Sequence, residues 1–227
     1  AVGPALDKNA PYNPTKDLTA IGPIHEAPMV LSVSPKGQIK NFADFTAKAK
    51  AANSAVSIGS AGNGSSQHLA LELLALKMQL KLTHIPYKGS GPAINDAVGG
   101  QIDSILDQVI ASIGHIKGGT LVAIAQSGNT RSALLPGVPT FQELGAKDVD
   151  ILTFTGLFGP VGMPAGVTDK LTAALKQALA TTAVKERFTS LGVDIMNLDR
   201  TAFTQYVAKD FATAMAIGKA ANIVINQ

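Results

Sequence analysis

The stretch from Ser60 to Ser66 holds the residues whose types and spacing most clearly suggest chemistry. The apolar run Val56–Gly59 leads into a turn of small and polar residues, and the turn leads into a segment with helical periodicity. The start of a helix offers unpaired backbone N–H groups and the positive end of the helix dipole, so it can bind an anion without a charged side chain. The residues of this candidate anion site are Ser60, Ala61, Gly62, Asn63, Gly64, Ser65 and Ser66.

The structural alternative for this stretch is a plain strand-to-helix turn with a serine cap. Ser65 or Ser66 can cap the helix, but two glycines and three small polar residues exceed what a cap requires, so the pattern favours binding. The turn also comes close to a dinucleotide fingerprint. However, Gln67 occupies the place of the third glycine, and the acidic residue expected about 20 positions later is missing. A nucleotide-dependent α/β enzyme is therefore the weaker alternative.

Polar residues also follow two further predicted strands. Ligands of open parallel sheets bind beyond the carboxyl ends of the strands, so we expect these residues near the same site. They are Tyr87, Lys88 and Gly89 after one strand, and Asp107 and Gln108 after another. Tyr87 can form a wall of the site and Lys88 can steer an anion, although a solvated surface lysine is more common. Asp107 can accept a ligand ammonium or hydroxyl group, or equally cap the next helix.

The titratable residues give no sign of catalysis. The four histidines lack metal-ligand spacing, and the chain has no cysteine. There is no G-x-S-x-G elbow and no evident set of nucleophile, base and orienting group. We therefore expect a protein without catalytic residues, metal or cofactor. His68 lies in the first turn of the helix after the glycines and can touch a ligand, although packed or capping histidines are more common.

The composition argues against several classes of partner. Charged residues make up 15% of the chain, the formal net charge is +3, and the basic residues are scattered. Aromatic residues make up 5% and tryptophan is absent, so we expect no nucleic-acid surface. No apolar run resembles a membrane span, since the uncharged stretch Ile151–Ala165 is interrupted by glycines and prolines. No signal peptide is visible, which fits a cytosolic or an already processed chain.

Strand-like and helix-like segments alternate with short connections through the middle of the chain. This alternation predicts an α/β fold with a mainly parallel sheet and helices on both faces. The predicted strands here are Val56–Gly59, Leu82–Pro86, Ile102–Leu106 and Leu121–Ala125, and the predicted helices are Asn41–Ala52, Ser65–Met78, Gly91–Val98 and Val109–Ile116.

The two ends of the chain are less regular. Residues 1–17 have no clear period and are predicted to be extended, and Leu18–Ser34 reads as β-structure broken by Pro23 and Pro28. Ile151–Val161 reads as a strand. Helices are predicted near residues 168–181, 184–191 and 201–222.

Short motifs recur in a specific order along nearly the whole chain. They are Tyr12–Leu18, Ala27–Leu31, Gly62–Ser65 with His68–Ala70, Pro86–Gly89, Gly99–Asp103, Leu135–Thr140 with Glu143 and Gly145, and Gly156–Phe158 with Pro160 and Pro164. In this order and spacing the chain resembles the substrate-binding receptors of tripartite tricarboxylate transporters, the Bordetella uptake (Bug) receptor family.

The resemblance implies a two-lobed periplasmic-binding-protein-like (Venus flytrap) fold in the periplasm. A monomeric receptor of this kind holds a small carboxylate between its lobes and hands it to membrane subunits. The turn from Ser60 to Ser66 then matches one of the family's two carboxylate-binding turns, and Tyr87–Gly89 with Asp107–Gln108 match neighbouring pocket positions. A sensor module on the same fold would bind the same ligands and stays open as an alternative.

The resemblance also implies a division of the chain. Residues 30–152 correspond to a complete second lobe, and residues 1–29 and 153–227 correspond to part of the first lobe, with crossovers near Pro28 and Thr153. By comparison with the family, the N-terminal portion of the first lobe, which carries the other carboxylate turn, is not in this chain. The first lobe is therefore expected to be incomplete.

Overall fold

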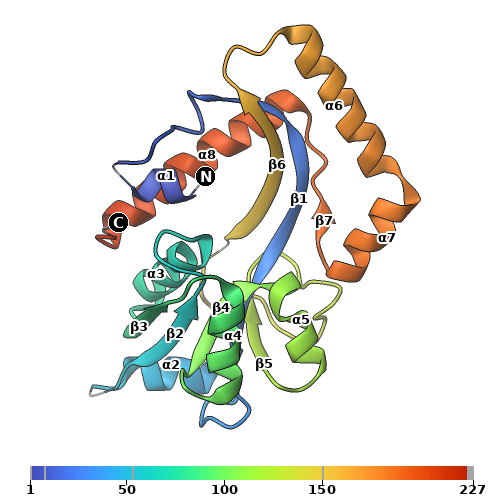
Figure 1. Ribbon diagram of the computed structural model, residues 1–227. Helices are drawn as coiled ribbons and strands as arrows, with labels where there is room; N and C mark the ends of the chain where they lie inside the picture. Colours follow the sequence, from blue (N-terminus) through green and yellow to red (C-terminus); the bar gives the residue numbers. More distant parts are fainter. Residues whose placement is uncertain (1, 8, 53, 150, 224–227) are drawn as a thin grey trace. The chain divides into compact units, whose positions relative to one another are not determined.

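The computed structural model describes residues 2–7, 9–52, 54–149 and 151–223. It divides into two compact units: residues 28–153, called the central unit, and residues 1–27 with 154–227, called the terminal unit. Residues 1 and 224–227, at the ends of the predicted first lobe, lie outside the described residues. The elements in Figure 1 are α1 (Val2–Leu6), β1 (Leu18–Val33), α2 (Phe42–Lys50), β2 (Val56–Ser60), α3 (Ser66–Met78), β3 (Leu82–Pro86), α4 (Ser90–Gly99), β4 (Ser104–Gln108), α5 (Val109–Lys117), β5 (Val122–Gln126), β6 (Leu152–Pro160), α6 (Ala165–Ala180), α7 (Thr182–Leu191), β7 (Asp194–Ile195) and α8 (Arg200–Ala220).

The central unit is built on a sheet with the strand order β3-β2-β4-β1-β5. Strand β2 runs parallel to β3 and β4, whereas β1 runs antiparallel to β4 and β5. Strands β2 to β5 therefore point the same way, which confirms the predicted α/β class with a mainly parallel sheet. Because Ser60 pairs with Pro86, the carboxyl ends of β2 and β3 are level.

Local capping explains where the helices of the central unit begin and end. The Asn41 side chain accepts a hydrogen bond from the backbone N–H of Asp44 and caps α2, and Ser65 caps α3 through the N–H of His68. Gly100 adopts the left-handed conformation that ends α4. A core cluster that includes Ala93, Ile94, Ala97, Ile102, Ile105 and Leu121 lies between α4 and the sheet.

The terminal unit packs the first part of β1 against β6, β7 and helix α8. Its buried cluster contains Ala20, Met196, Phe203 and Val207. Two glycines allow close packing here. A Cβ atom at Gly156 would overlap the Phe203 ring, and one at Gly218 would overlap the Leu6 side chain of α1. Helices α6 and α7 are mostly exposed, with Thr168 the one buried residue among them in the described part of the chain.

Two predictions about the ends of the chain are wrong, and one short strand was missed. Pro23 and Pro28 do not break the first β-segment, because β1 continues from Leu18 to Val33 as one strand. In the pairings of β1 with β7 and with β4, Pro23 lies outside the first and Pro28 lies just before the second begins, so neither of these two ladders needs a proline N–H. The segment predicted to be extended contains α1, which packs on α8, and β7 was not predicted.

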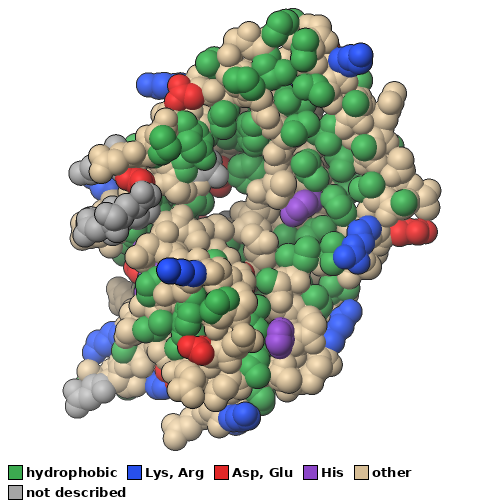
Figure 2. Space-filling view, in the orientation of Figure 1, with side chains coloured by type: hydrophobic (Ala, Val, Ile, Leu, Met, Phe, Trp, Pro, Cys, Tyr) green, Lys and Arg blue, Asp and Glu red, His purple; other side chains and the backbone are tan. Residues whose placement is uncertain are grey.

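None of the described helices is both long and apolar enough to cross a membrane. On the face shown in Figure 2, the charged side chains are scattered singly over the surface and do not gather in a patch. The scattering of basic residues seen in the sequence is therefore preserved on this face.

Candidate functional site

The predicted glycine turn lies between β2 and α3 and depends on its two glycines. Gly62 has a φ of 127° and Gly64 a φ of 73°, values that residues with a side chain rarely adopt. Gly62 is also close to the next strand end, since a Cβ atom there would lie 2.9 Å from the carbonyl oxygen of Tyr87. The turn is therefore a specific backbone shape that the sequence permits only because these positions are glycine.

Several amides of the turn that was expected to offer unpaired N–H groups are hydrogen-bonded internally. The N–H of Gly62 donates to Ser60 Oγ at 3.1 Å, and the N–H of Gly64 donates to His68 Nδ1 at 3.2 Å. The N–H of Ser65 donates to the carbonyl of Gly62 at 3.2 Å. The acceptors of these bonds all lie within a few residues of the donors, so the bonds are local and hold the turn in one shape.

Four other amides at the turn remain available. Within the described part of the chain, no hydrogen bond engages the backbone N–H of Ala61, Asn63, Ser66 or Gln67. Ser66 and Gln67 are the first two residues of α3, whose N–H groups point away along the helix axis. Asn63 is exposed, and Ala61 and Ser66 are half-buried, so solvent reaches this side of the turn.

The structure brings the residues after β3 next to the glycine turn. The N–H of Tyr87 donates to the carbonyl of Ser60 at 3.1 Å, and the N–H of Gly89 donates to the carbonyl of Ala61 at 3.2 Å. The Tyr87 hydroxyl donates to Asp96 Oδ2 at 2.8 Å, and burial together with this carboxylate raises the pKa of Tyr87 to about 12. The Tyr87 ring can thus form a wall, while its hydroxyl is committed to Asp96. Lys88 is exposed.

Asp107 at the end of β4 is connected to the turn through a residue that was not predicted to take part. The Asp107 side chain is 1% exposed, and its Oδ1 accepts hydrogen bonds from Gln67 Nε2 at 2.8 Å and from the N–H of Gln108 at 2.7 Å. Helix α5 starts after Gln108, which occupies the N-cap position, so Asp107 does not cap that helix in the expected way. Asp107 instead fixes Gln67 at the start of α3.

A pair of stacked imidazoles lies behind the turn. The rings of His68 and His84 have centroids 4.0 Å apart and an interplanar angle of 18°. His84 Nε2 lies 2.6 Å from Ser60 Oγ, and His68 Nε2 lies 3.7 Å from Glu72 Oε1. Burial, followed by the His68 ring, lowers the pKa of His84 to about 4, against the opposing effect of Glu72. No sequence pattern pointed to His84, because its role depends on contact between α3 and β3.

No metal site accompanies these side chains. Among the described residues, no group of three or more His, Cys, Asp or Glu side chains is arranged to hold a metal ion. The chemistry that the turn offers is therefore hydrogen bonding from main-chain donors to a negatively charged group.

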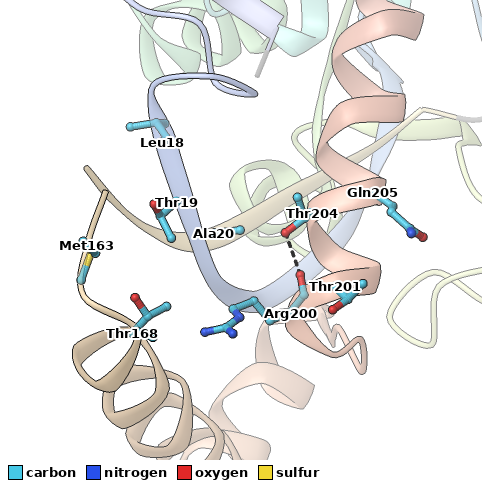
Figure 3. A pocket seen from close by; sticks show the side chains of 10 residues that line it. Leu18, Thr19, Ala20, Met163, Thr168, Arg200, Thr201, Thr204 and Gln205 are labelled. Atoms are coloured by element: carbon cyan, nitrogen blue, oxygen red, sulfur yellow. Dashed lines mark hydrogen bonds between the residues drawn. The ribbon is translucent and has the colours of Figure 1, made fainter. Parts of the chain in front are cut away.

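The terminal unit contains a separate pocket of about 620 Å³ (Figure 3), which was not predicted. It lies where α6 and α8 begin and is lined by Leu18, Thr19, Ala20, Met163, Ala165, Thr168, Arg200, Thr201, Thr204 and Gln205. Its hydroxyl groups are largely committed: those of Thr19, Thr168 and Thr204 donate to backbone carbonyls. Arg200 pairs with Asp169 at 2.9 Å. These internal bonds make the pocket a weaker candidate than the turn.

Comparison with known proteins identifies the family of the chain. Residues 1–223 match the model of the tripartite tricarboxylate transporter family receptor. The chain belongs to this receptor family. The predicted resemblance to Bug-type receptors is thereby confirmed, and the alternative of a nucleotide-dependent enzyme is wrong, because the family is one of receptors.

Individual relatives of the chain agree with its assignment to this receptor family. It is 38% identical over 213 residues to an Agrobacterium vitis protein, the UPF0065 protein in the TAR-I ttuE-ttuC' intergenic region, covering 94% of this chain and 58% of the relative. The solved structure of the periplasmic binding protein BugD is 30% identical with a TM-score of 0.89, covering 98% of this chain and 75% of that one. MatC of Rhodopseudomonas palustris with bound malate is 28% identical with a TM-score of 0.85, covering 94% and 74%. The chain thus has the periplasmic-binding-protein fold and spans less than two thirds of the length of the Agrobacterium relative.

Proposed function

We propose that this chain is part of an extracytoplasmic solute receptor that binds a small carboxylate through the turn between β2 and α3. The observation that carries the proposal is the set of four backbone N–H groups, those of Ala61, Asn63, Ser66 and Gln67, that no described residue engages. In this proposal Ala61, Asn63 and Ser66 supply the main donors, because these residues are at least partly exposed.

The charge of the ligand is met by neutral groups in this proposal. The start of α3 carries about half a positive charge, worth roughly 0.3–1 kcal/mol to a nearby anion, and each charge-assisted hydrogen bond adds about 1.5–3 kcal/mol before losses. A micromolar complex requires about 8 kcal/mol. Three or four such donors with some apolar burial reach this range, and the exposed Lys88 adds long-range attraction.

The remaining residues of the site act mainly through the turn. Asp107 holds Gln67 at the start of α3, the Tyr87 ring lies near Gly59, and the backbone of Gly89 bonds to Ala61. Ser60, Gly62, Gly64 and Ser65 shape the turn through the internal bonds described above. The malate bound to MatC supports a small dicarboxylate as the class of ligand.

The organisation of the whole receptor follows from the family. We assign residues 30–152 to a complete second lobe and residues 1–29 with 153–227 to part of the first lobe, which the two compact units support. The receptor is placed in the periplasm, works as a monomer and meets the membrane subunits of a tripartite tricarboxylate transporter transiently. Family membership supports the periplasmic location and the transporter subunits as partners, while the monomeric state and the transient contact are part of the proposal.

Calorimetric titration with malate, succinate, citrate, adipate and benzoate tests the proposal. We expect at least one acid to bind with a Kd in the micromolar range and its amide derivative to bind far more weakly, because the donors at the turn need a negatively charged partner. No heat with any of these anions would contradict the proposal, as would equal binding of acid and amide.

A matched pair of glycine variants locates the binding to the turn. Gly64→Val places a β-branched residue at a φ of 73° inside the turn, and Gly145→Val does the same at a φ of 84° in another turn of the central unit. Both should lose a similar amount of stability, of order 1–3 kcal/mol, while only Gly64→Val should lose the ligand. Equal affinity of the two variants would exclude this turn as the binding site.

A further inference from the structure

The stacked pair of His68 and His84 contacts the glycine turn at both of its ends. His84 Nε2 lies 2.6 Å from Ser60 Oγ, which accepts the N–H of Gly62 at 3.1 Å. His68 Nδ1 accepts the N–H of Gly64 at 3.2 Å. The amides of both glycines are therefore held, directly or through Ser60, by one pair of imidazoles.

The hydrogen bond from Gly64 specifies the proton on the His68 ring. An imidazole nitrogen that accepts a hydrogen bond carries no proton, so His68 Nδ1 is bare and the ring proton is on Nε2, which faces Glu72 Oε1 at 3.7 Å. The Ser60 hydroxyl lies 2.6 Å from His84 Nε2 and 3.3 Å from the Gly62 carbonyl, so it can donate to either one, and both tautomers of His84 fit this contact. The proposal therefore concerns the proton on His68 Nδ1.

The groups around the pair determine what happens when it takes up a proton. Two charged rings at a centroid distance of 4.0 Å would repel each other, so the pair holds at most one added proton at moderate pH. On α3 the facing carboxylate is Glu72, on β2 the neighbour is the uncharged Ser60, and on β4 Asp107 bonds to Gln67 of the same helix. Burial and the neighbouring ring keep the pKa of His84 low, at about 4, and Glu72 faces the His68 ring.

We propose that His68 and His84 are positioning residues of the turn, and that a proton taken up on His68 Nδ1 releases the Gly64 amide and weakens ligand binding. This inference rests on the proposed function of the turn. A protonated Nδ1 is a donor, so it cannot accept from Gly64, and two donors then face each other. Glu72 lies 3.7 Å from Nε2 on the other edge of the ring and offers the Gly64 N–H no acceptor, so the lost hydrogen bond is not replaced. Binding should therefore weaken when this nitrogen takes up a proton.

The first test needs no ligand. Protein labelled with ¹⁵N-glycine is titrated from about pH 8 to pH 5, the range of an ordinary histidine, and the Gly64 amide resonance is followed by NMR. In the wild type it should shift along a single titration curve. In His68→Asn the side-chain oxygen takes the place of Nδ1 as an acceptor that does not titrate, so the shift should disappear. His115→Asn, which changes a ring bonded to Thr120 on α5, is the control and should behave like the wild type.

The second test measures malate affinity at pH 7.5 and pH 5 in the same proteins, so that the titration of malate itself cancels. At pH 5 the wild type should bind malate about 5- to 10-fold more weakly than His68→Asn does. A difference of this size corresponds to the loss of one hydrogen bond. If malate does not bind the wild type at pH 7.5, the acid selected by calorimetry takes its place. If none of the five acids binds, the proposed function fails, and the glycine titration still decides whether a proton on His68 releases the Gly64 amide. A Gly64 resonance that does not move in the wild type, or that moves equally in His68→Asn, would overturn it.

Discussion

The α-carbon of Gly62 faces the carbonyl oxygen of Tyr87 so closely that a Cβ atom would lie 2.9 Å from it. This contact places the turn after β2 directly against the start of the turn after β3. Because the obstacle is backbone, it cannot move without shifting one of the two strand ends. The distance therefore couples the shape of the proposed binding site to the packing of the sheet.

Replacing Gly62 by alanine should disturb both the shape of the proposed binding site and the packing of the sheet. The φ of 127° and the contact with Tyr87 together should cost about 2 kcal/mol or more of unfolding free energy, and ligand affinity should fall at least about tenfold. Gly119→Ala is the control, since Gly119 has a φ of 69° with no neighbour within 4 Å, and it should cost about 1 kcal/mol without affecting binding. Thermal denaturation and calorimetry measure the two effects. A Gly62→Ala protein with normal stability would show that the contact relaxes freely.

Replacing Gln67 by leucine should destabilise the central unit. The variant removes the Nε2 donor from a carboxylate that is 1% exposed, leaving Asp107 with the Gln108 amide as its one remaining donor among the described residues. An unsatisfied buried acceptor costs about 1–3 kcal/mol. Gln142→Leu, which removes an exposed bond to Asn129, should cost less than about 0.5 kcal/mol. Denaturant unfolding compares the two, and equal losses would argue against the importance of the buried bond.

Replacing Tyr87 by phenylalanine separates a wall from a hydrogen-bonding ligand contact. The hydroxyl donates to Asp96, so its loss should lower stability by about 1 kcal/mol and change ligand affinity less than about threefold. Calorimetry on the acid that binds the wild type measures this. A loss of affinity of tenfold or more would mean that the hydroxyl turns toward the ligand.

The ion pair between Lys48 and Asp103 should make stability depend on acid pH. Burial raises the pKa of the Asp103 carboxyl, but hydrogen bonds from Lys48 and from the backbone and side chain of Ser57 outweigh it, so the pKa is lower than usual. This stabilisation is present above the unfolded pKa of about 4 and is lost as the pH falls through the folded value. Asp103→Asn should therefore cost about 1–3 kcal/mol at pH 7 and progressively less below pH 4.

The exposed pair of Asp169 with Arg200 provides the control for this prediction. The Asp169 side chain is 67% exposed, whereas that of Asp103 is 27% exposed. Asp169→Asn should change stability by less than about 1 kcal/mol at any pH. Unfolding by urea between pH 3 and pH 7 measures both variants. A cost of Asp103→Asn that stays constant over this range would contradict the assignment of the depressed pKa.

The sequence was informative where local patterns determine structure. The alternation of strands and helices in the middle of the chain predicted the sheet of the central unit. In this region the hydrophobic periodicity and the turn residues between the elements indicate the same boundaries. It was less informative about β1, where Pro23 and Pro28 looked like breaks. Whether a proline interrupts a strand depends on which neighbouring strand needs its N–H, and pairing between distant segments is not visible in one sequence.

The candidate site shows the same limit. The glycines predicted the turn, but two of the expected donors, the amides of Gly62 and Gly64, are held by Ser60 and His68. Part of a signal for the second bond was present, since Ser65-x-x-His68 has the spacing of a capping box, but His68 accepts from the Gly64 amide, one residue before the cap, and not from Ser65. The roles of Gln67 and His84 had no such signal, because they depend on contacts with β4 and with α3 across the fold.

The most direct test of the central claim follows backbone amides during ligand titration. Amide ¹H and ¹⁵N shifts of Ala61, Asn63 and Ser66 are recorded by NMR as the acid selected by calorimetry is added. We predict saturable shifts at these three amides with the affinity found by calorimetry, and smaller shifts at Gly62 and Gly64, whose N–H groups have internal partners. Tight binding of an acid that leaves Ala61, Asn63 and Ser66 unchanged would contradict the claim that the turn holds the ligand.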